Sequence, residues 1–324
     1  MEQEKYPASN DHSKGADSVN MKKFDLSPKF ILSVVVVLSI CFCVNFCYAQ
    51  EGDVAQEGDV PDSPGPVNDF DLLTQRLVQD GFDQEKTKAL FGNKAVGFDP
   101  GGVSLFFIHS ESSLNYDQFS SSKSIAKARK YMVMHKDSLD KAQEAFSVDK
   151  AIITAILLVE TRLGTYLGNR TVINTLSTMA ALTDSILAER VWRAISDNKK
   201  PERAAFDKKV AQKSRWGYEE LKALISYANR EGIDPVTVKG SYAGAMGIPQ
   251  FMPSNALTLA RDGNQDGKVD LFDHDDAIFS VANYLKHHGW KSGLSRQRQH
   301  EVLFRYNHSN YYVDALLKIS DKLK

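Results

Sequence analysis

The run AIITAILLV, from Ala151 to Val159, is apolar except for Thr154 and ends directly at a carboxylate, Glu160. A helix that is apolar on every face has to be buried, so the rest of the chain must pack around this segment. We therefore expect a central helix here, with Ser147 as its N-cap. The composition permits such a core, since 42% of the 324 residues are hydrophobic and 25% are charged, as in globular proteins.

The position of Glu160 suggests a chemical role. The buried helix gives this residue a low-dielectric setting on at least one side, and burial raises the pKa of a carboxyl group. A Glu with a pKa of about 4.3 is protonated roughly once in 500 molecules at neutral pH, against roughly one in ten at a pKa of about 6. Gly164, and Gly168 if the helix continues, lie on the same helical face and leave the acid uncovered. The alternative is that Glu160 pairs with Arg162 or another base and that Gly164 merely ends the helix.

The chain from about Phe70 to Lys324 reads as mainly helical. Residues 218–230 place apolar side chains at helical spacing before Gly232, and residues 275–288 repeat this pattern before a second glycine. Strand signals are weak, and GVSLFFIH around Val103 is the best short candidate.

Charge and histidine patterns exclude several classes of function. The 40 basic and 41 acidic residues give a net charge of -1, so no global field recruits nucleic acid or an anionic membrane surface. The eight histidines form no nucleophile or metal-ligand spacing, and no Ser-His-Asp motif is present. His287 and His288 lie in the last turn of an expected helix, where the helix dipole favours positive charge.

The N-terminus is predicted to lie outside the fold. Residues 1–20 are an extension or a mis-assigned start, and residues 21–49 combine lysines with a long apolar run that ends at Ala49. This pattern indicates an export signal, and the alternative is an uncleaved membrane anchor. Residues 50–69 repeat QEGDV, carry acids without bases and are predicted to be a disordered linker. The apolar run holds all three cysteines, so the processed protein would have no disulfide: Cys41, Cys43 and Cys47.

The segment GSYAGAMGIPQFMPSN, residues 240–255, combines three glycines with hydrogen-bonding side chains at Ser241, Tyr242 and Gln250. Glycines allow close backbone approach, so the segment suits a polar, uncharged ligand. It lacks the spacing of a phosphate-binding loop. The alternative is a connector whose larger apolar side chains pack inward, namely Met246, Phe251 and Met252.

The segment DGNQDGKVDLFD, residues 262–273, has the spacing of a calcium-binding loop. Gly267 stands where the sharp turn is needed, and Lys268 would contribute only its backbone carbonyl. The last position is an Asp where the usual pattern has a bidentate Glu, which favours looser coordination. The alternative is an acidic surface turn. The side-chain ligands would be Asp262, Asn264, Asp266, Asp270 and Asp273.

The segment FRYNHSNYYVDALL, residues 304–317, clusters aromatic and amide side chains. Aromatic faces beside amides and hydroxyls suit sugar rings, although tyrosines at helical spacing also form cores. The residues concerned are Tyr306, Asn307, Tyr311 and Tyr312.

These motifs, in this order, closely resemble the membrane-bound lytic murein transglycosylase B family of glycoside hydrolases. The resemblance covers roughly residues 70–324 and is carried by AILLVETRLGTYLGNRTVINTLSTMA, GSYAGAMGIPQFMPS, the acidic loop and YNHSNYY. It implies an α+β, lysozyme-like catalytic core, mainly helical, with additional helical lobes and an EF-hand-like loop. It also implies cleavage of the bond between N-acetylmuramic acid and N-acetylglucosamine in peptidoglycan, without water.

The resemblance also assigns roles to residues. Glu160 matches the catalytic acid, and the loop 262–273 matches the ion site, with calcium expected and sodium possible. Ile248 and Pro249 stand where some relatives have Tyr-Gly, which puts one sugar contact in doubt, and residues 182–215 match only loosely. The substrate-binding residues that the resemblance implies are Ser241, Gln250, Tyr306, Asn307 and Tyr312.

A single Glu suffices for this reaction, because the C6 hydroxyl of the substrate replaces water as the nucleophile. Two rival functions stay open: a hydrolytic muramidase with a second carboxylate, and a non-catalytic wall-binding protein. We expect an exported monomer in the periplasm or envelope, free or membrane-anchored, with no organic cofactor and no nucleic-acid partner. Wall-synthesis or envelope-machinery proteins are the other partners considered.

Overall fold

A computed structural model describes residues 68–108 and 115–324 of the chain. The predicted N-terminal extension, the predicted export signal and all but the last two residues of the predicted linker lie outside these residues. Within them, no helix is both long enough and apolar enough to cross a membrane.

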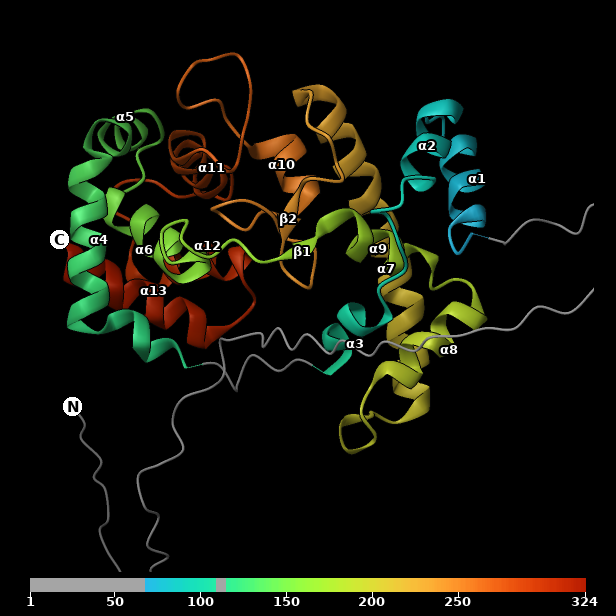
Figure 1. Cartoon of the computed structure of the whole chain (residues 1–324). Helices are drawn as coiled ribbons and strands as arrows, with labels where there is room; N and C mark the ends of the chain where they lie inside the picture. Colours follow the sequence, from blue (N-terminus) through green and yellow to red (C-terminus); the bar gives the residue numbers. More distant parts are fainter. Residues whose placement is uncertain (1–67, 109–114) are drawn as a thin grey trace, which may run out of the picture. The chain divides into compact units, whose positions relative to one another are not determined.

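The described residues form a mainly helical unit (Figure 1), which confirms the predicted fold class. The elements in chain order are α1 (Asp71–Gln79), α2 (Gln84–Phe91), α3 (Pro100–Ile108), η2 (Tyr116–Ser120), α4 (Ser122–Met134), α5 (Lys136–Phe146), α6 (Lys150–Thr161), β1 (Arg170–Thr171), α7 (Val172–Ala181), α8 (Ser185–Ala194), η3 (Asp197–Lys199), α9 (Arg203–Glu231), β2 (Lys239–Gly240), α10 (Pro253–Leu259), α11 (His274–His287), α12 (Arg296–Tyr306) and α13 (Asn310–Leu323).

Helix α6 is the predicted central helix. Every residue from Ala151 to Leu158 is buried, and α4, α5, α11 and α13 pack around it. The predicted N-cap, Ser147, is wrong. The carboxylate of Asp149 accepts the Ala151 N–H at 2.8 Å, whereas Ser147 ends α5 in a left-handed conformation. Ser147 is therefore the C-cap of the preceding helix, α5, and not the N-cap of α6.

Helices α7 and α9 form a second packed group, in which α3 packs on α7 and α8 packs on α3. Helix α9 is longer than predicted, because it begins at Arg203 and runs through the predicted segment 218–230 to Glu231. Its N-terminal half buries Phe206, Val210, Ser214 and Gly217, which continue the buried stripe one turn at a time. The loosely matching segment 182–215 thus forms α8, η3 and the start of α9.

The predicted strand around Val103 is wrong, because this segment is helix α3. Asp99 accepts the Gly102 N–H at 2.8 Å and Pro100 occupies the first turn, which together start a helix. Val103 and Phe107, one turn apart, are both buried. The apolar run therefore covers one helical face and not both faces of a strand.

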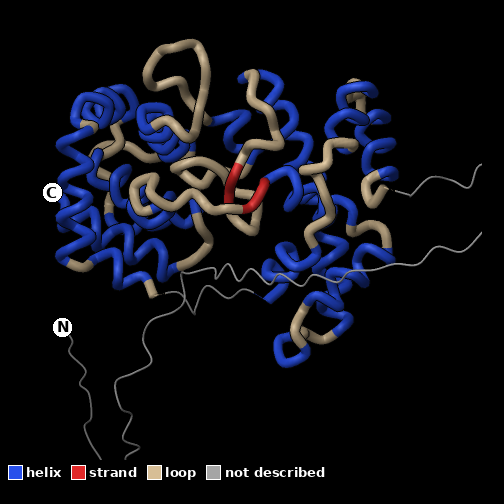
Figure 2. Tube along the Cα trace, viewed as in Figure 1, coloured by secondary structure: helices blue, strands red, loops and turns tan. Residues whose placement is uncertain are grey.

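Two two-residue strands join the helical groups (Figure 2). Strands β1 and β2 pair antiparallel, with Arg170 opposite Gly240. Gly168, just before β1, has a φ of +85°, and a Cβ there would lie 2.1 Å from the Gly240 carbonyl oxygen. The two backbones can meet here because Gly168 has no side chain.

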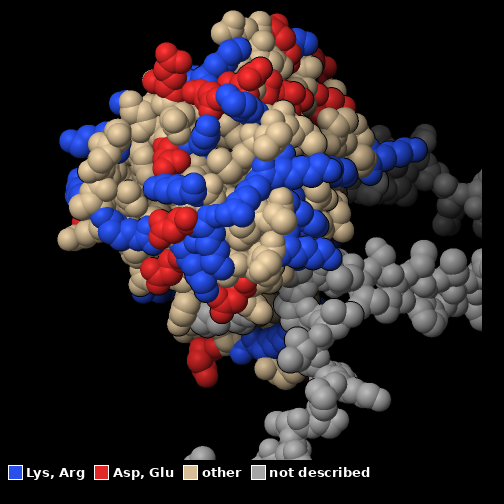
Figure 3. Space-filling view, turned by 90° about the vertical axis from the view of Figure 1, so that its left-hand side faces the viewer, with Lys and Arg blue, Asp and Glu red and all other residues tan. Residues whose placement is uncertain are grey.

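Helix α11 confirms the second predicted helix, within one residue at each end. Figure 3 shows a molecular face on which Lys and Arg side chains gather across the middle, with Asp and Glu above and beside them. Some of these opposite charges form ion pairs, and the carboxylate of Asp140 on α5 pairs with both Lys136 and Lys150.

Candidate active site

The candidate acid, Glu160, lies in the last turn of α6 and is half-buried. The helix ends immediately after it, since Arg162 and Leu163 adopt left-handed φ angles of 53° and 62°. The Thr161 hydroxyl donates to the Ile248 carbonyl oxygen at 2.8 Å and accepts the Gly164 N–H at 3.0 Å. The end of α6 is thus fixed to the glycine-rich segment.

Tyr312 and Glu160 meet at the centre of the site. The Tyr312 hydroxyl, on α13, donates a 2.5 Å hydrogen bond to Oε1 of Glu160. Burial, and next the Glu160 carboxylate, raise the pKa of Tyr312 well above its usual range. The phenol therefore stays protonated and remains a donor.

Tyr306 extends this arrangement. Its ring lies nearly parallel to that of Tyr312, with centroids 6.5 Å apart and 16° between the planes. Its hydroxyl donates to the Pro249 carbonyl oxygen at 2.6 Å. Burial and then Glu160 raise the pKa of Tyr306 well above its usual range. The two predicted tyrosines and the predicted acid are thus brought together.

Tyr116 is a site residue that the sequence did not reveal. It lies on η2, and its ring packs edge-on against Tyr312 with centroids 6.0 Å apart. It belongs to a short 3-10 helix with no hydrophobic period, so no periodic signal marks it. Only the fold brings Tyr116 next to α13.

Helix α6 ends at Thr161 and does not continue through Gly164 and Gly168. Gly168 therefore does not lie on the same helical face as Glu160, which was expected only if the helix continued. Gly164 has a φ of +81°, and a Cβ there would lie 2.9 Å from the ring of His274 and 3.3 Å from Ile248. Its missing side chain thus permits chain packing. The Arg162 guanidinium donates to the side-chain carbonyl oxygen of Gln118 at 3.3 Å.

Ser241 follows β2 and organises the glycine-rich turn. Its hydroxyl oxygen accepts the N–H groups of Ala243 and Ala245 at 3.2 and 3.1 Å. These bonds occupy the oxygen's acceptor sites, so the hydroxyl hydrogen is the part that can bind a ligand.

Gln250 lies in a left-handed conformation, with a φ of 51°. Its amide nitrogen donates to the carbonyl oxygens of Gly247 and Leu167 at 2.9 and 3.5 Å. Within the described residues its amide oxygen accepts no hydrogen bond, so it can accept one from a ligand. Met246 and Phe251 of the same segment are buried, so the inward packing of the alternative interpretation coexists with these polar groups.

The remaining polar residue of the predicted site, Asn307, ends α12 directly after Tyr306 and is half-buried. Tyr311 of the same motif is 62% exposed, whereas Tyr312 is 1% exposed. The motif therefore splits between the site and the surface.

The acidic loop lies between α10 and α11, at the top of Figure 1. The Asp262 carboxylate accepts the N–H groups of Gln265, Asp266 and Gly267 at 2.6, 3.2 and 2.9 Å. Gln265 and Gly267 have φ angles of 64° and 86°, which make the sharp turn expected at Gly267. The other predicted ligands also accept nearby backbone N–H groups: Asn264, Asp266, Asp270 and Asp273.

Asp276, which the loop pattern does not include, connects the two ends of the loop. Its carboxylate accepts the N–H groups of Gly263 and Asp270 at 2.7 and 2.6 Å, and burial raises its pKa. Across the described ranges, no three His, Cys, Asp or Glu side chains come close enough to hold a metal ion. The ligand set of the loop therefore stays a prediction.

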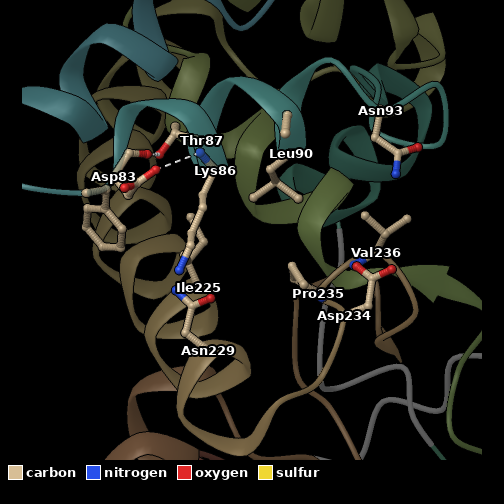
Figure 4. A pocket seen from close by; sticks show the side chains of 12 residues that line it. Asp83, Lys86, Thr87, Leu90, Asn93, Ile225, Asn229, Asp234, Pro235 and Val236 are labelled. Carbon is tan, nitrogen blue, oxygen red and sulfur yellow. Dashed lines mark hydrogen bonds between the residues drawn. The ribbon is translucent and has the colours of Figure 1, made fainter.

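Two cavities lie away from Glu160. One, between α2 and α9, is lined by Lys86, Leu90, Asn229 and Val236 among others, and Figure 4 shows Lys86 and Asn229 approaching one another across it. The other lies between α1 and α8. Neither contains a predicted site residue.

Comparison with known proteins decides the family. The model of the transglycosylase SLT domain family matches residues 68–301. The chain belongs to this transglycosylase family. The match includes α6, the glycine-rich segment and the acidic loop, but ends before Tyr306 and Tyr312.

A similar sequence is the membrane-bound lytic murein transglycosylase B of Escherichia coli (strain K12), 35% identical over 159 residues. The aligned stretch covers 49% of this chain and only 37% of that relative, so the chain spans little more than a third of the relative's length.

Solved structures share the fold of this transglycosylase family member. Soluble lytic transglycosylase SltB1 from Pseudomonas aeruginosa has a TM-score of 0.63 at 24% identity, over 78% of this chain and 97% of that one. Escherichia coli lytic transglycosylase Slt35 in complex with calcium gives 0.62 at 21%, over 79% and 92%. Pseudomonas aeruginosa SltB3 in complex with NAG-anhNAM-pentapeptide gives 0.62 at 19%, over 78% of each chain.

Proposed function

We propose that this protein is a lytic transglycosylase of peptidoglycan, which cleaves the β-1,4 bond between N-acetylmuramic acid and N-acetylglucosamine. The main observation in support is the position of Glu160 at the end of a buried helix, with its Oε1 2.5 Å from the hydroxyl oxygen of Tyr312. Family membership supports the reaction class. The sugar-peptide ligand of SltB3 supports the substrate class.

In this proposal Glu160 acts twice. Its protonated form donates a proton to the glycosidic oxygen as the bond from that oxygen to C1 of the muramoyl residue breaks. Its carboxylate then accepts the proton of the C6 hydroxyl, whose oxygen bonds to C1. The products are a new 4-hydroxyl on N-acetylglucosamine and a 1,6-anhydro-N-acetylmuramic acid end, and no water is consumed.

The surroundings of Glu160 support this single-acid chemistry. Among the described residues, Tyr312, Tyr306 and Tyr116 supply phenol and ring surfaces at this end of α6. A donor at 2.5 Å fixes the carboxylate orientation in both steps. Two-carboxylate hydrolysis needs an additional acid placed to activate water or attack carbon.

Ser241 and Gln250 would orient the sugar. The Ser241 hydroxyl offers a donor and the Gln250 amide oxygen offers an acceptor. This pair complements an N-acetyl group, which carries one carbonyl oxygen and one N–H. Asn307, which directly follows Tyr306 at the end of α12, is proposed to add an amide.

A cation, calcium or sodium, is proposed for the acidic loop in a structural role. Carboxylate, amide and carbonyl oxygens form a donor set suited to a hard cation, and Slt35 was solved in complex with calcium. The residues that would hold it are Asp262, Asn264, Asp266, Asp270 and Asp273, with the carbonyl of Lys268. The ion would stabilise the folded conformation of the loop that precedes α11.

We propose an envelope location for the protein, since a relative is named as membrane-bound and the substrate lies in the wall. The export signal, an anchored form, a monomeric state and partners in wall synthesis or envelope machinery stay predictions from the sequence.

Mass analysis of the products released from purified peptidoglycan tests the function. The protein should release anhydro-ended muropeptides, one water lighter than reducing-end products, and Glu160→Gln should lower the rate by about 10²–10⁴-fold. Glu144→Gln, at an exposed position on α5, is the matched control and should keep the wild-type rate. Reducing-end products would instead identify a muramidase, and no release by the wild type would favour a wall-binding protein.

A further inference from the structure

An aromatic and basic cluster lies beside Ser241 and is not part of the site above. The rings of Phe106 on α3 and Trp216 on α9 stack with centroids 5.9 Å apart and 25° between the planes. The ring of Tyr242 lies 6.5 Å from that of Phe106. The Lys213 Nζ lies 4.7 Å from the centroids of both Phe106 and Trp216. The Lys209 Nζ lies 5.4 Å from the Phe106 centroid and donates to the Phe106 carbonyl oxygen at 3.1 Å.

The ammonium groups of Lys209 and Lys213 have no acidic partner among the described residues. Among the described residues neither Lys209 nor Lys213 forms an ion pair, whereas Arg203 on the same helix pairs with acids on α8 and α9. Both lysines are half-buried. Burial lowers the pKa of each, and the neighbouring Lys213 adds to this effect on Lys209. Two partly desolvated positive charges that have no acidic partner in residues 68–108 and 115–324 attract an anion strongly.

The cluster is held in a fixed relation to the sugar-binding segment. The Asp99 carboxylate, which caps α3, binds Arg170 of β1 at 2.6 Å. A Cβ on Gly102 would lie 2.0 Å from Asp99 and 2.2 Å from Arg170, so helix and strand are in direct contact there. Arg170 pairs in the ladder with Gly240, the residue before Ser241. Lys209 therefore contacts α3, which binds β1, and β1 pairs with the strand that precedes Ser241.

The substrate class supplies only one kind of anion. The sugar rings of peptidoglycan carry hydroxyl and N-acetyl groups, and the lactyl carboxyl of the muramoyl residue forms an amide with the peptide. The carboxylates therefore belong to the stem peptide. Aromatic rings and ammonium groups together suit a carboxylate attached to a short peptide.

On the basis of the proposed function, we propose that Lys209 and Lys213 form a subsite for a carboxylate of the stem peptide on the bound glycan strand. Phe106 and Trp216 hold the ammonium groups in place through their ring faces. Because the peptide is remote from the bond that breaks, the subsite contributes the same binding energy to ground state and transition state. Its loss raises KM and leaves kcat unchanged.

The experiment compares two substrates: purified glycan strands with intact stem peptides, and the same strands after enzymatic removal of the stems. The test variant is Lys209→Met/Lys213→Met, which keeps apolar stems against the rings. Lys208→Met, at an exposed position on the same helix, is the matched control. Lys209→Arg/Lys213→Arg keeps both charges.

The expected result is a roughly tenfold lower kcat/KM of the double Met variant on stem-bearing strands, which corresponds to about 1.4 kcal/mol for the two lost charge contacts together. Its kcat/KM on stripped strands should equal that of the wild type. The double Arg variant and Lys208→Met should behave as wild type on both. An equal fall on both substrates, or no fall on either, overturns the subsite.

Failure of the proposed function gives a different result. If the wild type cleaves neither strand, that function is wrong. The subsite is then decided by calorimetric binding of NAG-NAM-pentapeptide to the Glu160→Gln protein. Binding at least about fivefold weaker when both lysines are Met supports the subsite, and an equal Kd overturns it.

Discussion

The Tyr312 hydroxyl lies 2.5 Å from Oε1 of Glu160, although 152 positions of sequence separate the two residues. The contact joins the first turn of α13 to the last turn of α6, and these two helices pack directly on one another. Tyr312 is 1% exposed, so its ring cannot move without disturbing this packing. The orientation of the carboxylate is therefore built into the core.

Tyr312→Phe should lower the rate of peptidoglycan cleavage by roughly tenfold to a hundredfold, because it removes the hydrogen bond that orients Glu160. The fold should persist, since the ring is kept. Tyr311→Phe, at the exposed neighbouring position, should leave the rate unchanged. Equal rates for wild type and Tyr312→Phe, measured by release of soluble muropeptides, would refute this role of the hydroxyl.

The sequence predicted those parts of the site that local patterns encode. The apolar run before Glu160 identified the buried helix, and Gly232 identified the end of α9, because burial and chain reversal leave a local signature. The spacing from Asp262 to Gly267 predicted a sharp turn, which the φ angle of Gly267 confirms.

Other features depend on tertiary contacts that no local pattern records. Tyr116 reaches the site because η2 packs on α13. Asp276 lies on α11, and its carboxylate binds backbone N–H groups at both ends of the acidic loop that precedes this helix. The segment around Val103 was interpreted as a strand because its apolar run is short. The segment is instead helical because Asp99 caps its first turn and because α8 packs against it. The contact with α8 is known only from the fold.

Gly168→Ala should destabilise the protein severely. The new Cβ would lie 2.1 Å from the Gly240 carbonyl oxygen, which is backbone and cannot rotate away. Overpacking and the φ of +85° together should cost at least about 3 kcal/mol. Gly81→Ala is the matched control, since its φ is +94° but no atom lies within 4 Å of the new Cβ. It should cost about 1 kcal/mol. Equal losses in chemical denaturation would show that the contact with β2 is unimportant.

Removal of calcium should lower the melting temperature if the acidic loop binds it. At calcium concentrations about 100 times Kd the ion adds about 2.7 kcal/mol of stability, so a chelator should lower the Tm by roughly 5–10 °C for a domain of this size. Asp266→Ala should abolish the response to calcium. Asp314→Ala, an exposed acid on α13, should keep it. A Tm that is the same with calcium and with chelator would exclude a structural ion.

His288 should make the protein less stable in mild acid. The helix dipole was predicted to favour its positive charge, but the structure corrects this, because burial against Tyr284 lowers the pKa of His288, and the positive charges of His287 and Arg305 lower it further. The folded-state pKa thus lies below the unfolded value of about 6.5. The unfolded chain binds more protons between these two values, so the contribution to stability is complete above about pH 6.5 and is lost as the pH falls toward the folded-state pKa.

The free energy of unfolding, measured by urea titration from pH 7.5 to pH 5, should therefore fall more for the wild type than for His288→Gln. His308→Gln, at an exposed histidine, serves as the control and should reproduce the wild-type slope. A His288→Gln slope as steep as that of the wild type would mean that this imidazole is protonated equally well in the folded and unfolded chains, and that burial against Tyr284 does not hold it neutral.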